Sequence, residues 1–134
     1  MIKSVKAGKE IVITSKNKVG MLSQVAKILA DHGINIIALS AQAAGGVALM
    51  NFVVDDHLRA MDSLRKAKFQ VQENNVVLIC VEDKPGVLRF LTQRLAAKKV
   101  DLMNIYGSTT TTYAPCLLVV VSSNNQKAIV TLRK

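Results

Sequence analysis

The sequence predicts an α+β protein made of two ferredoxin-like βαββαβ units, with helices packed on antiparallel sheets and the second unit lacking its last strand. The chain of 134 residues repeats itself at an offset of 66, so that Gly20 aligns with Gly86 and Val53-Val54 with Val119-Val120. Within each repeat, short β-branched segments alternate with segments whose apolar residues have helical spacing. A period this long, carried by apolar positions, indicates two copies of one supersecondary unit.

The first repeat is predicted to have the order β-α-β-β-α-β. Strands are expected at residues 11–14, 34–39, 47–54 and 69–71, and helices at residues 21–32 and from position 55 or 56 to 67. The first helix should end at Gly33, and Gly45-Gly46 supplies the glycines of a hairpin turn. The second helix should turn Leu58, Met61 and Leu64 towards the sheet. This order is the split ferredoxin-like arrangement, in which both helices cover one face of the sheet.

The second repeat is predicted to have the same order without its final strand. Strands are expected at residues 76–81, 100–105 and 116–121, and helices at residues 86–98 and from about residue 125. Asp83 can cap the first of these helices, and Pro85 can lie in its first turn. The expected domains are a leader at residues 1–9, a first domain at 10–74 and a C-terminally incomplete second domain at 75–134. The leader is either disordered or fills the missing strand position.

Composition excludes several classes of protein. No run of eighteen apolar residues is present and residues 1–10 lack the apolar section of a signal peptide, so a cytoplasmic location without membrane contact is expected. Cys80 and Cys116 lie far apart in apolar strands, which is typical of buried thiols. The 18 Lys and Arg residues outnumber the 9 Asp and Glu residues. A polyanionic partner therefore stays open, but the charges are spread along the chain and few aromatic residues are available to stack on bases.

No set of catalytic or metal-binding residues is recognisable. The two histidines, His32 and His57, lie near helix ends and are expected at the surface. Asp55-Asp56 is explained by helix capping and by the helix dipole. The run of threonines at residues 109–112 is interpreted as a polar hairpin linker. The sequence therefore predicts a protein that is not an enzyme, with no metal site and no cofactor.

Two motifs in register resemble those of ACT domains. The family signature runs from a first strand through Asn/Asp-x-Pro-Gly-x-Leu into a helix that ends at Gly-Ile/Val-Asn-Ile/Leu. Residues 17–22 (NKVGML) with 33–36 (GINI), and residues 83–88 (DKPGVL) with 100–102 (VDL), are similar to it. Val19 replaces the proline in the first copy, and Lys99 replaces the glycine in the second. The resemblance covers residues 10–134 and indicates a tandem pair of ACT domains.

The resemblance implies a regulatory module that binds an amino acid between edge-paired domains. Each site would combine the strand-to-helix turn of one domain with the strand after the helix of its partner. The ligand-binding residues carried over in this way are Asn17, Val19, Gly20, Met21, Leu22, Asn35, Asp83, Gly86, Val87, Leu88 and Asp101.

The two copies differ in the chemistry at these positions. The amides of Asn17 and Asn35 can serve both the carboxylate and the ammonium of an amino acid. Asp83 and Asp101 would repel a carboxylate, so the second copy is expected to be the poorer site or purely structural. The alternative for the two asparagines is a helix cap and a turn at the start of a strand.

The functional hypothesis is a cytoplasmic, homodimeric protein that binds an amino acid and passes this binding to its own dimer or to a regulated enzyme or regulator. The first alternative is an oligomerisation scaffold without a small ligand. The second is a basic protein that binds nucleic acid, whose affinity would fall strongly with salt.

Overall fold

The structure is a computed structural model that describes residues 1–109, 111 and 113–134. In chain order its elements are β1 (Ile2–Lys16), α1 (Met21–Asp31), β2 (Ile36–Ala44), β3 (Val47–Val54), α2 (His57–Lys66), β4 (Val71–Glu82), α3 (Val87–Ala97), β5 (Leu102–Ser108), β6 (Pro115–Ser122) and α4 (Asn125–Arg133). The linker predicted at residues 109–112 includes Thr110 and Thr112, which lie outside the described residues.

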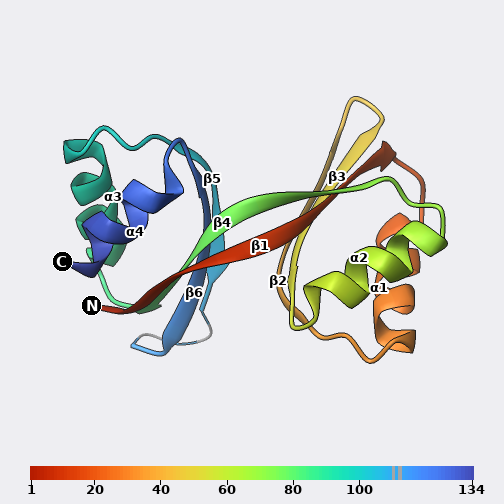
Figure 1. Cartoon of the computed structure of the whole chain (residues 1–134), viewed down its shortest axis with the longest axis horizontal. Helices are drawn as coiled ribbons and strands as arrows, with labels where there is room; N and C mark the ends of the chain where they lie inside the picture. Colours follow the sequence, from red (N-terminus) through yellow and green to blue (C-terminus); the bar gives the residue numbers. More distant parts are fainter. Residues whose placement is uncertain (110, 112) are drawn as a thin grey trace. The chain divides into compact units, whose positions relative to one another are not determined.

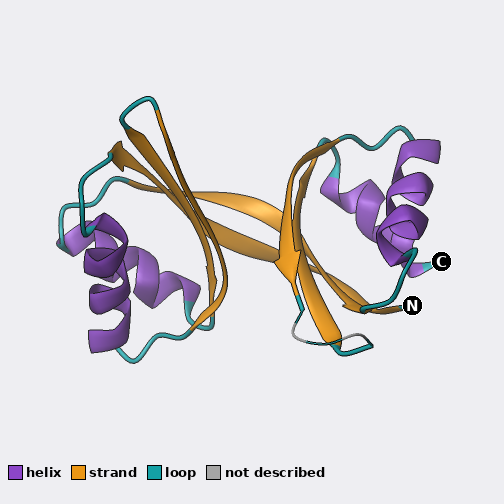
Figure 2. Cartoon of the chain, turned by 180° about the vertical axis from the view of Figure 1, so that it is seen from behind, coloured by secondary structure: helices purple, strands orange, loops and turns teal. Residues whose placement is uncertain are grey.

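The chain forms two compact units. The first unit comprises Lys9–Asn74, and the second unit comprises Met1–Gly8 together with Asn75–Lys134. In the first unit the strand order is β2-β3-β1-β4, and in the second it is β1-β4-β6-β5. In each unit two helices lie on one face of the sheet (Figures 1 and 2). The predicted α+β class and ferredoxin-like units are confirmed.

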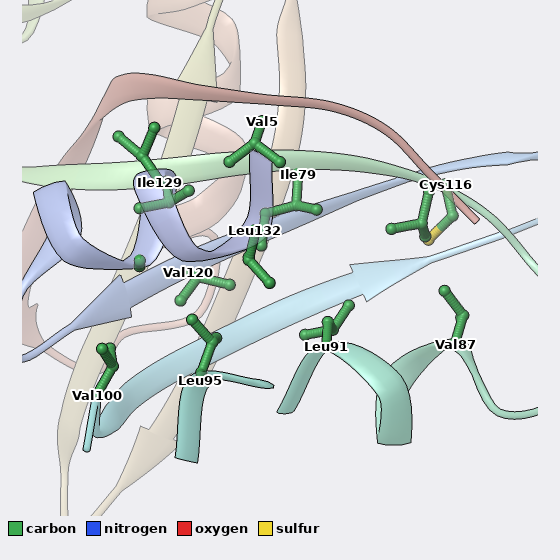
Figure 3. Packing of buried hydrophobic residues seen from close by; sticks show 13 residues of the cluster. Val5, Ile79, Val87, Leu91, Leu95, Val100, Cys116, Val120, Ile129 and Leu132 are labelled. Atoms are coloured by element: carbon green, nitrogen blue, oxygen red, sulfur yellow. The ribbon is translucent and has the colours of Figure 1, made fainter. Parts of the chain in front are cut away.

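The first eight residues complete the sheet of the second unit. Two alternatives were open for the leader, disorder and a strand, and the structure contains the strand. Residues 1–8 therefore belong to the second compact unit instead of forming a separate leader. Val5 is 6% exposed and belongs to the core of the second unit (Figure 3). The Glu82 N–H donates to the Met1 carbonyl, and the Arg133 guanidinium donates twice to the Val5 carbonyl. These bonds hold the strand in the position of a fourth strand.

Helix α2 buries two of the three residues that were predicted to face the sheet, Met61 and Leu64. Its buried residues include Ala60, Met61 and Leu64, whereas Leu58 is 80% exposed. The prediction that Leu58 packs inward was therefore wrong. Successive helical residues are about 100° apart, so Leu58 lies about 200° from Ala60 and points away from the buried side. The predicted cap is confirmed, because the Asp56 carboxylate accepts from the Arg59 N–H.

The turns explain why the repeat tolerates some changes of residue. Gly45 and Gly46 both have positive φ, as the tip of a two-residue hairpin requires. Gly33 ends helix α1 with φ 68°, and Lys99 ends α3 in the same left-handed region with φ 59°. The Gly33 and Lys99 N–H groups donate to equivalent carbonyls, those of Ala30 and Ala96. The lysine therefore reproduces the turn that glycine makes in the first copy.

Strands β1 and β4 are longer than predicted. They run through Ile2–Lys16 and Val71–Glu82 without interruption, whereas Phe69 precedes the strand that it was expected to begin. No proline or glycine stands between residues 71 and 82 to end the extended backbone.

Both cysteines are free. Within the described residues, no helix combines the length and the apolar character that crossing a membrane requires.

Candidate functional site

The turn between β1 and α1 has an exposed backbone. Gly20 is the N-cap residue of α1 with φ 85°, and no side chain caps the helix. The Asn17 N–H donates to the Gly46 carbonyl over 2.8 Å, which ties the turn to the tip of the β2–β3 hairpin. The alternative that Asn17 is a helix cap is therefore wrong. Its side chain makes no hydrogen bond with any residue that the structure describes.

Two N–H groups at the start of α1 are available to a ligand. The Met21 N–H donates to the Lys18 carbonyl, and the Gln24 N–H donates to the Gly20 carbonyl. Between them, the N–H groups of Leu22 and Ser23 have no partner among the described residues. Unpaired N–H groups and the positive end of the helix dipole favour an anion at this position. A Cβ placed at Gly20 would meet no atom within 4 Å, so the space beside this residue is open.

A cavity of about 300 Å³ lies against this turn. Four of the predicted residues line it, namely Asn17, Gly20, Met21 and Leu22. Val19 is fully exposed and is not part of the lining. The lining residues that the sequence did not predict are Lys18, Ser23, Ala41, Gln42, Ala43, Ala48 and Met50.

Five of the seven unpredicted residues, all except Lys18 and Ser23, come from the hairpin of β2 and β3. The strand pairing places them there. Ala43 pairs with Ala48 in the hairpin, and Lys16, the last residue of β1, pairs with Val47. The end of the hairpin therefore lies beside the turn. Lys18 and Gln42 add a cation and an amide to the cavity, and both are suited to a carboxylate.

Asn35 lies at the other end of β2 from the cavity. It immediately precedes β2, whereas Gln42 and Ala43 lie near the end of that strand. The Asn35 N–H donates to the Asp55 carboxylate over 3.0 Å, and the Asp55 N–H donates to the Asn35 carbonyl. These two hydrogen bonds join the start of β2 to the end of β3. Within one unit, Asn17 and Asn35 do not meet.

The corresponding turn of the second unit has the same backbone with different side chains. Gly86 is the N-cap residue of α3 with φ 91°, and no side chain caps the helix, so the expected cap by Asp83 was wrong. Pro85 precedes the helix, which begins at Val87, rather than lying in its first turn. Asp83 instead uses its backbone, because its N–H donates to the Ala114 carbonyl and its own carbonyl accepts from Tyr113.

The two apolar residues that follow Gly86 lie in different surroundings. Val87 is 7% exposed and packs in the core (Figure 3), whereas Leu88 is 53% exposed. Asp101 precedes β5 and exchanges hydrogen bonds with Ser123, as Asn35 does with Asp55. The second unit therefore repeats the geometry of the first and replaces its amides with carboxylates.

The cysteines and histidines of the described residues have local partners or buried surroundings. Burial, with smaller contributions from Asp83 and Cys80, raises the pKa of the Cys116 thiol and keeps it protonated. His32 is bonded to the Ile28 carbonyl, and His57 is paired with Glu73. In the described part of the chain, no three His, Cys, Asp or Glu residues are grouped as metal ligands would be.

The comparisons with known proteins agree with this fold. Residues 11–73 match the model of the AHAS small subunit-like ACT domain. The chain is similar to protein BT0572 from Bacteroides thetaiotaomicron, with 27% identity and a TM-score of 0.89 over 96% of this chain and 88% of that one. A comparison with curated proteins gives no match.

Two further solved structures share the fold at lower identity. The ligand-free regulatory subunit of aspartate kinase from Thermus thermophilus has 15% identity and a TM-score of 0.69, over 98% of this chain and 96% of that one. The aspartokinase alpha and beta subunits have 14% identity and a TM-score of 0.70, over 99% and 97%. These structures and this chain share a pair of ferredoxin-like units. The match to an ACT domain covers the first unit, as the motif around Gly20 indicated.

Proposed function

We propose that this protein is a non-catalytic regulatory module that binds a free amino acid at the turn of its first unit. The observation that carries the proposal is the cavity beside Gly20, which combines two unpartnered N–H groups with Lys18, Asn17 and Gln42. The N–H groups and the lysine would hold the α-carboxylate. The side-chain oxygens of the two amides would accept from the ammonium.

The site would be completed by a second copy of the chain. Strand β2 is an edge strand of the first unit, so its outer side can pair with another β2. In an antiparallel pair, the start of one strand lies opposite the end of the other. The partner's Asn35 would then stand beside the cavity lined by Gln42 and Ala43. A homodimer of this kind explains why one unit alone keeps the two asparagines apart.

Binding at such a position would act on the dimer. A ligand that contacts both copies favours the arrangement in which both contacts are made, and this difference in affinity shifts the equilibrium. The regulated protein would be an enzyme or a regulator in the cytoplasm. Two of the similar structures are a regulatory subunit of aspartate kinase and aspartokinase subunits, which supports a regulatory role.

The second unit is the weaker candidate for the same ligand. Gly86 leaves the backbone as open as Gly20 does, but Asp83 and Asp101 stand where the first unit has amides. Two carboxylates near the ligand would oppose its own carboxylate. We therefore assign the amino-acid site to the first unit and a structural role to the second turn.

The alternative is a scaffold that pairs through its strand edges without a small ligand. The exposed apolar residues of the edge strands favour it: Ile37 and Leu39 of β2 are 51% and 45% exposed, and Met103 of β5 is 67% exposed. Such a protein would dimerise but would not respond to amino acids.

Thermal unfolding in the presence of each of the twenty amino acids separates these two functions. A ligand that binds only the folded protein raises the unfolding midpoint as its occupancy increases. We expect one amino acid to raise the midpoint, and Asn17→Ala and Asn35→Ala each to abolish the rise. The matched controls are Asp83→Ala and Asp101→Ala at the repeat-related positions, which should preserve it. No rise with any amino acid, in a folded dimer, would leave the scaffold as the function.

A further inference from the structure

The helices of the second unit carry an unusual distribution of charge. Every charged side chain in residues 84–100 and 123–134 is a lysine or arginine. Helices α3 and α4 belong to this region, and residues such as Leu95 and Leu132 point from them into the core (Figure 3). The charges therefore lie on the outer side of the helix layer.

A cavity of about 440 Å³ lies between these two helices. Arg94, Lys98, Lys127 and Lys134 contribute to its lining, and none of them has an Asp or Glu partner within the described residues. Arg94 is fixed, because it donates to the carbonyls of Thr131 and Lys134 over 2.8 and 2.7 Å, and its guanidinium lies over the Phe90 ring.

Apolar side chains lie between the cations. Ala97 and Val130 line the cavity, and Val130 is 52% exposed although it belongs to a helix of the folded unit. An aliphatic side chain placed here would remove apolar surface from water. The cavity thus offers one apolar contact surrounded by positive charge.

The corresponding helices of the first unit carry acidic residues that neutralise their lysines. At the positions related to Ala97 and Val130 by the repeat, it has Asp31 and Asp62. Asp31 pairs with Lys27 over 2.6 Å, and Asp62 pairs with Lys66 over 3.1 Å. The second unit has lysines at the positions of His32, Arg59 and Lys66, and it lacks both acids. Its positive charge is therefore not neutralised by its own side chains.

We propose that this groove of α3 and α4 binds an acidic peptide segment of a partner protein. An aliphatic residue of the peptide occupies the cavity at Ala97 and Val130, and flanking Glu or Asp residues pair with Lys98, Lys127 and Lys134. A peptide is favoured over a nucleic acid because the Phe90 ring is covered by Arg94, so that no aromatic face lines the cavity for base stacking. The groove and the cavity at Gly20 share no lining residue. A negative result for peptide binding would therefore not affect the proposed amino-acid site.

The test is fluorescence anisotropy with the purified full chain and a labelled peptide of alternating glutamate and leucine residues. Val130→Asp introduces into the groove the acid that the first unit has at the related position, Asp62. The new carboxylate would lie four residues before Lys134 and could pair with it, as Asp62 pairs with Lys66. We expect it to weaken binding by about tenfold or more, because it removes the apolar contact and opposes the peptide's carboxylates. The double variant Lys98→Gln with Lys127→Gln should weaken binding to a similar degree. Circular dichroism would verify that each variant is folded.

A matched pair of lysines in the first unit controls for net charge. Lys27→Gln with Lys66→Gln removes the same charge from helices whose lysines already have acidic partners, so binding should change by less than about twofold. An equal loss in both double variants would overturn the proposal, as would no binding at low ionic strength. Displacement of the peptide by single-stranded DNA, with higher affinity for the DNA, would replace the acidic peptide with a nucleic acid as the partner.

Discussion

The two units share one repeat, yet they obtain their fourth strands from different parts of the chain and hold them with different chemistry. In the first unit the fourth strand follows α2 directly, and Glu73 on it binds Lys9 and His57. In the second unit the fourth strand is the beginning of the chain, and Arg133 binds the backbone carbonyl of Val5. The comparison teaches that the fold requires a strand at this position but prescribes neither its sequence nor its connection.

The strand-to-helix turns differ in the opposite way, because their backbones agree and their side chains do not. Gly20 and Gly86 have φ of 85° and 91°, and in both turns the N–H groups two and three residues after the glycine are open. The differences are confined to residues such as Asn17 and Asp83. Backbone geometry is therefore what the repeat preserves, and the proposed difference in ligand preference would come from a few side chains.

The largest effect is expected from removing residues 1–8. The second unit would lose an edge strand and the buried Val5, so its stability should fall by at least the ~2 kcal/mol typical of emptying a core position. Hydrogen exchange should show loss of protection in β4, β6 and α4, with protection in α1 and α2 retained. Lys3→Ala with Lys6→Ala, at exposed positions of the same strand, is the control and should change little. Unchanged protection of the second unit after the deletion would show that this strand is not part of its core.

The sequence predicted the repeat and the order of elements but not the origin of this strand. Apolar spacing placed β3 at its observed bounds and α1 and α3 to within a residue or two at their ends. In residues 1–8, however, Ile2 and Val5 both contact the core although they are three residues apart, which strict alternation in a strand does not predict. Local patterning therefore gave no decision between a strand and disorder.

The candidate site was predictable to the extent that it is local. The turn motif identified Asn17, Gly20, Met21 and Leu22, because the φ of Gly20 and the start of α1 depend on neighbouring residues. Gln42 was missed since its place depends on long-range pairing of the hairpin with the end of β1. The prediction that Leu58 is buried was wrong for a related reason. The buried side of α2 is centred on Ala60 and Leu64, and this depends on how the helix packs in the folded unit.

A smaller effect is expected from replacing the turn glycines. Gly20→Ala and Gly86→Ala should each lower the unfolding free energy by about 1 kcal/mol, because a Cβ in the left-handed region is strained although it meets no atom within 4 Å. Urea unfolding of both variants measures this cost. Equal losses would confirm that the two backbones are equivalent. A loss in one variant alone would mean that one turn changes its conformation in solution.

The same pair of glycine variants also tests the proposed amino-acid binding. Gly20→Ala should also weaken the ligand-induced rise of the unfolding midpoint, because relief of the strained left-handed residue would shift the backbone that presents the N–H groups of Leu22 and Ser23. Gly86→Ala should leave that rise intact. The opposite result would place the ligand in the second unit.

The smallest effect concerns the charges that hold the fourth strand of the first unit. The hydrogen bond from His57, followed by that from Lys9, lowers the pKa of the Glu73 carboxyl below its ordinary value of 4.5. A lowered pKa in the folded protein contributes stability above pH 4.5 that is lost as the pH falls through the folded pKa. The unfolding midpoint of the parent protein should therefore decrease more steeply below pH 4.5 than that of Glu73→Gln. Arg133→Gln is the counterpart in the second unit. It should lower the midpoint by a similar amount across this range, because an arginine donating to a carbonyl does not titrate there. A steep pH dependence that persists in Glu73→Gln would contradict the assignment and place the titrating group elsewhere in the chain.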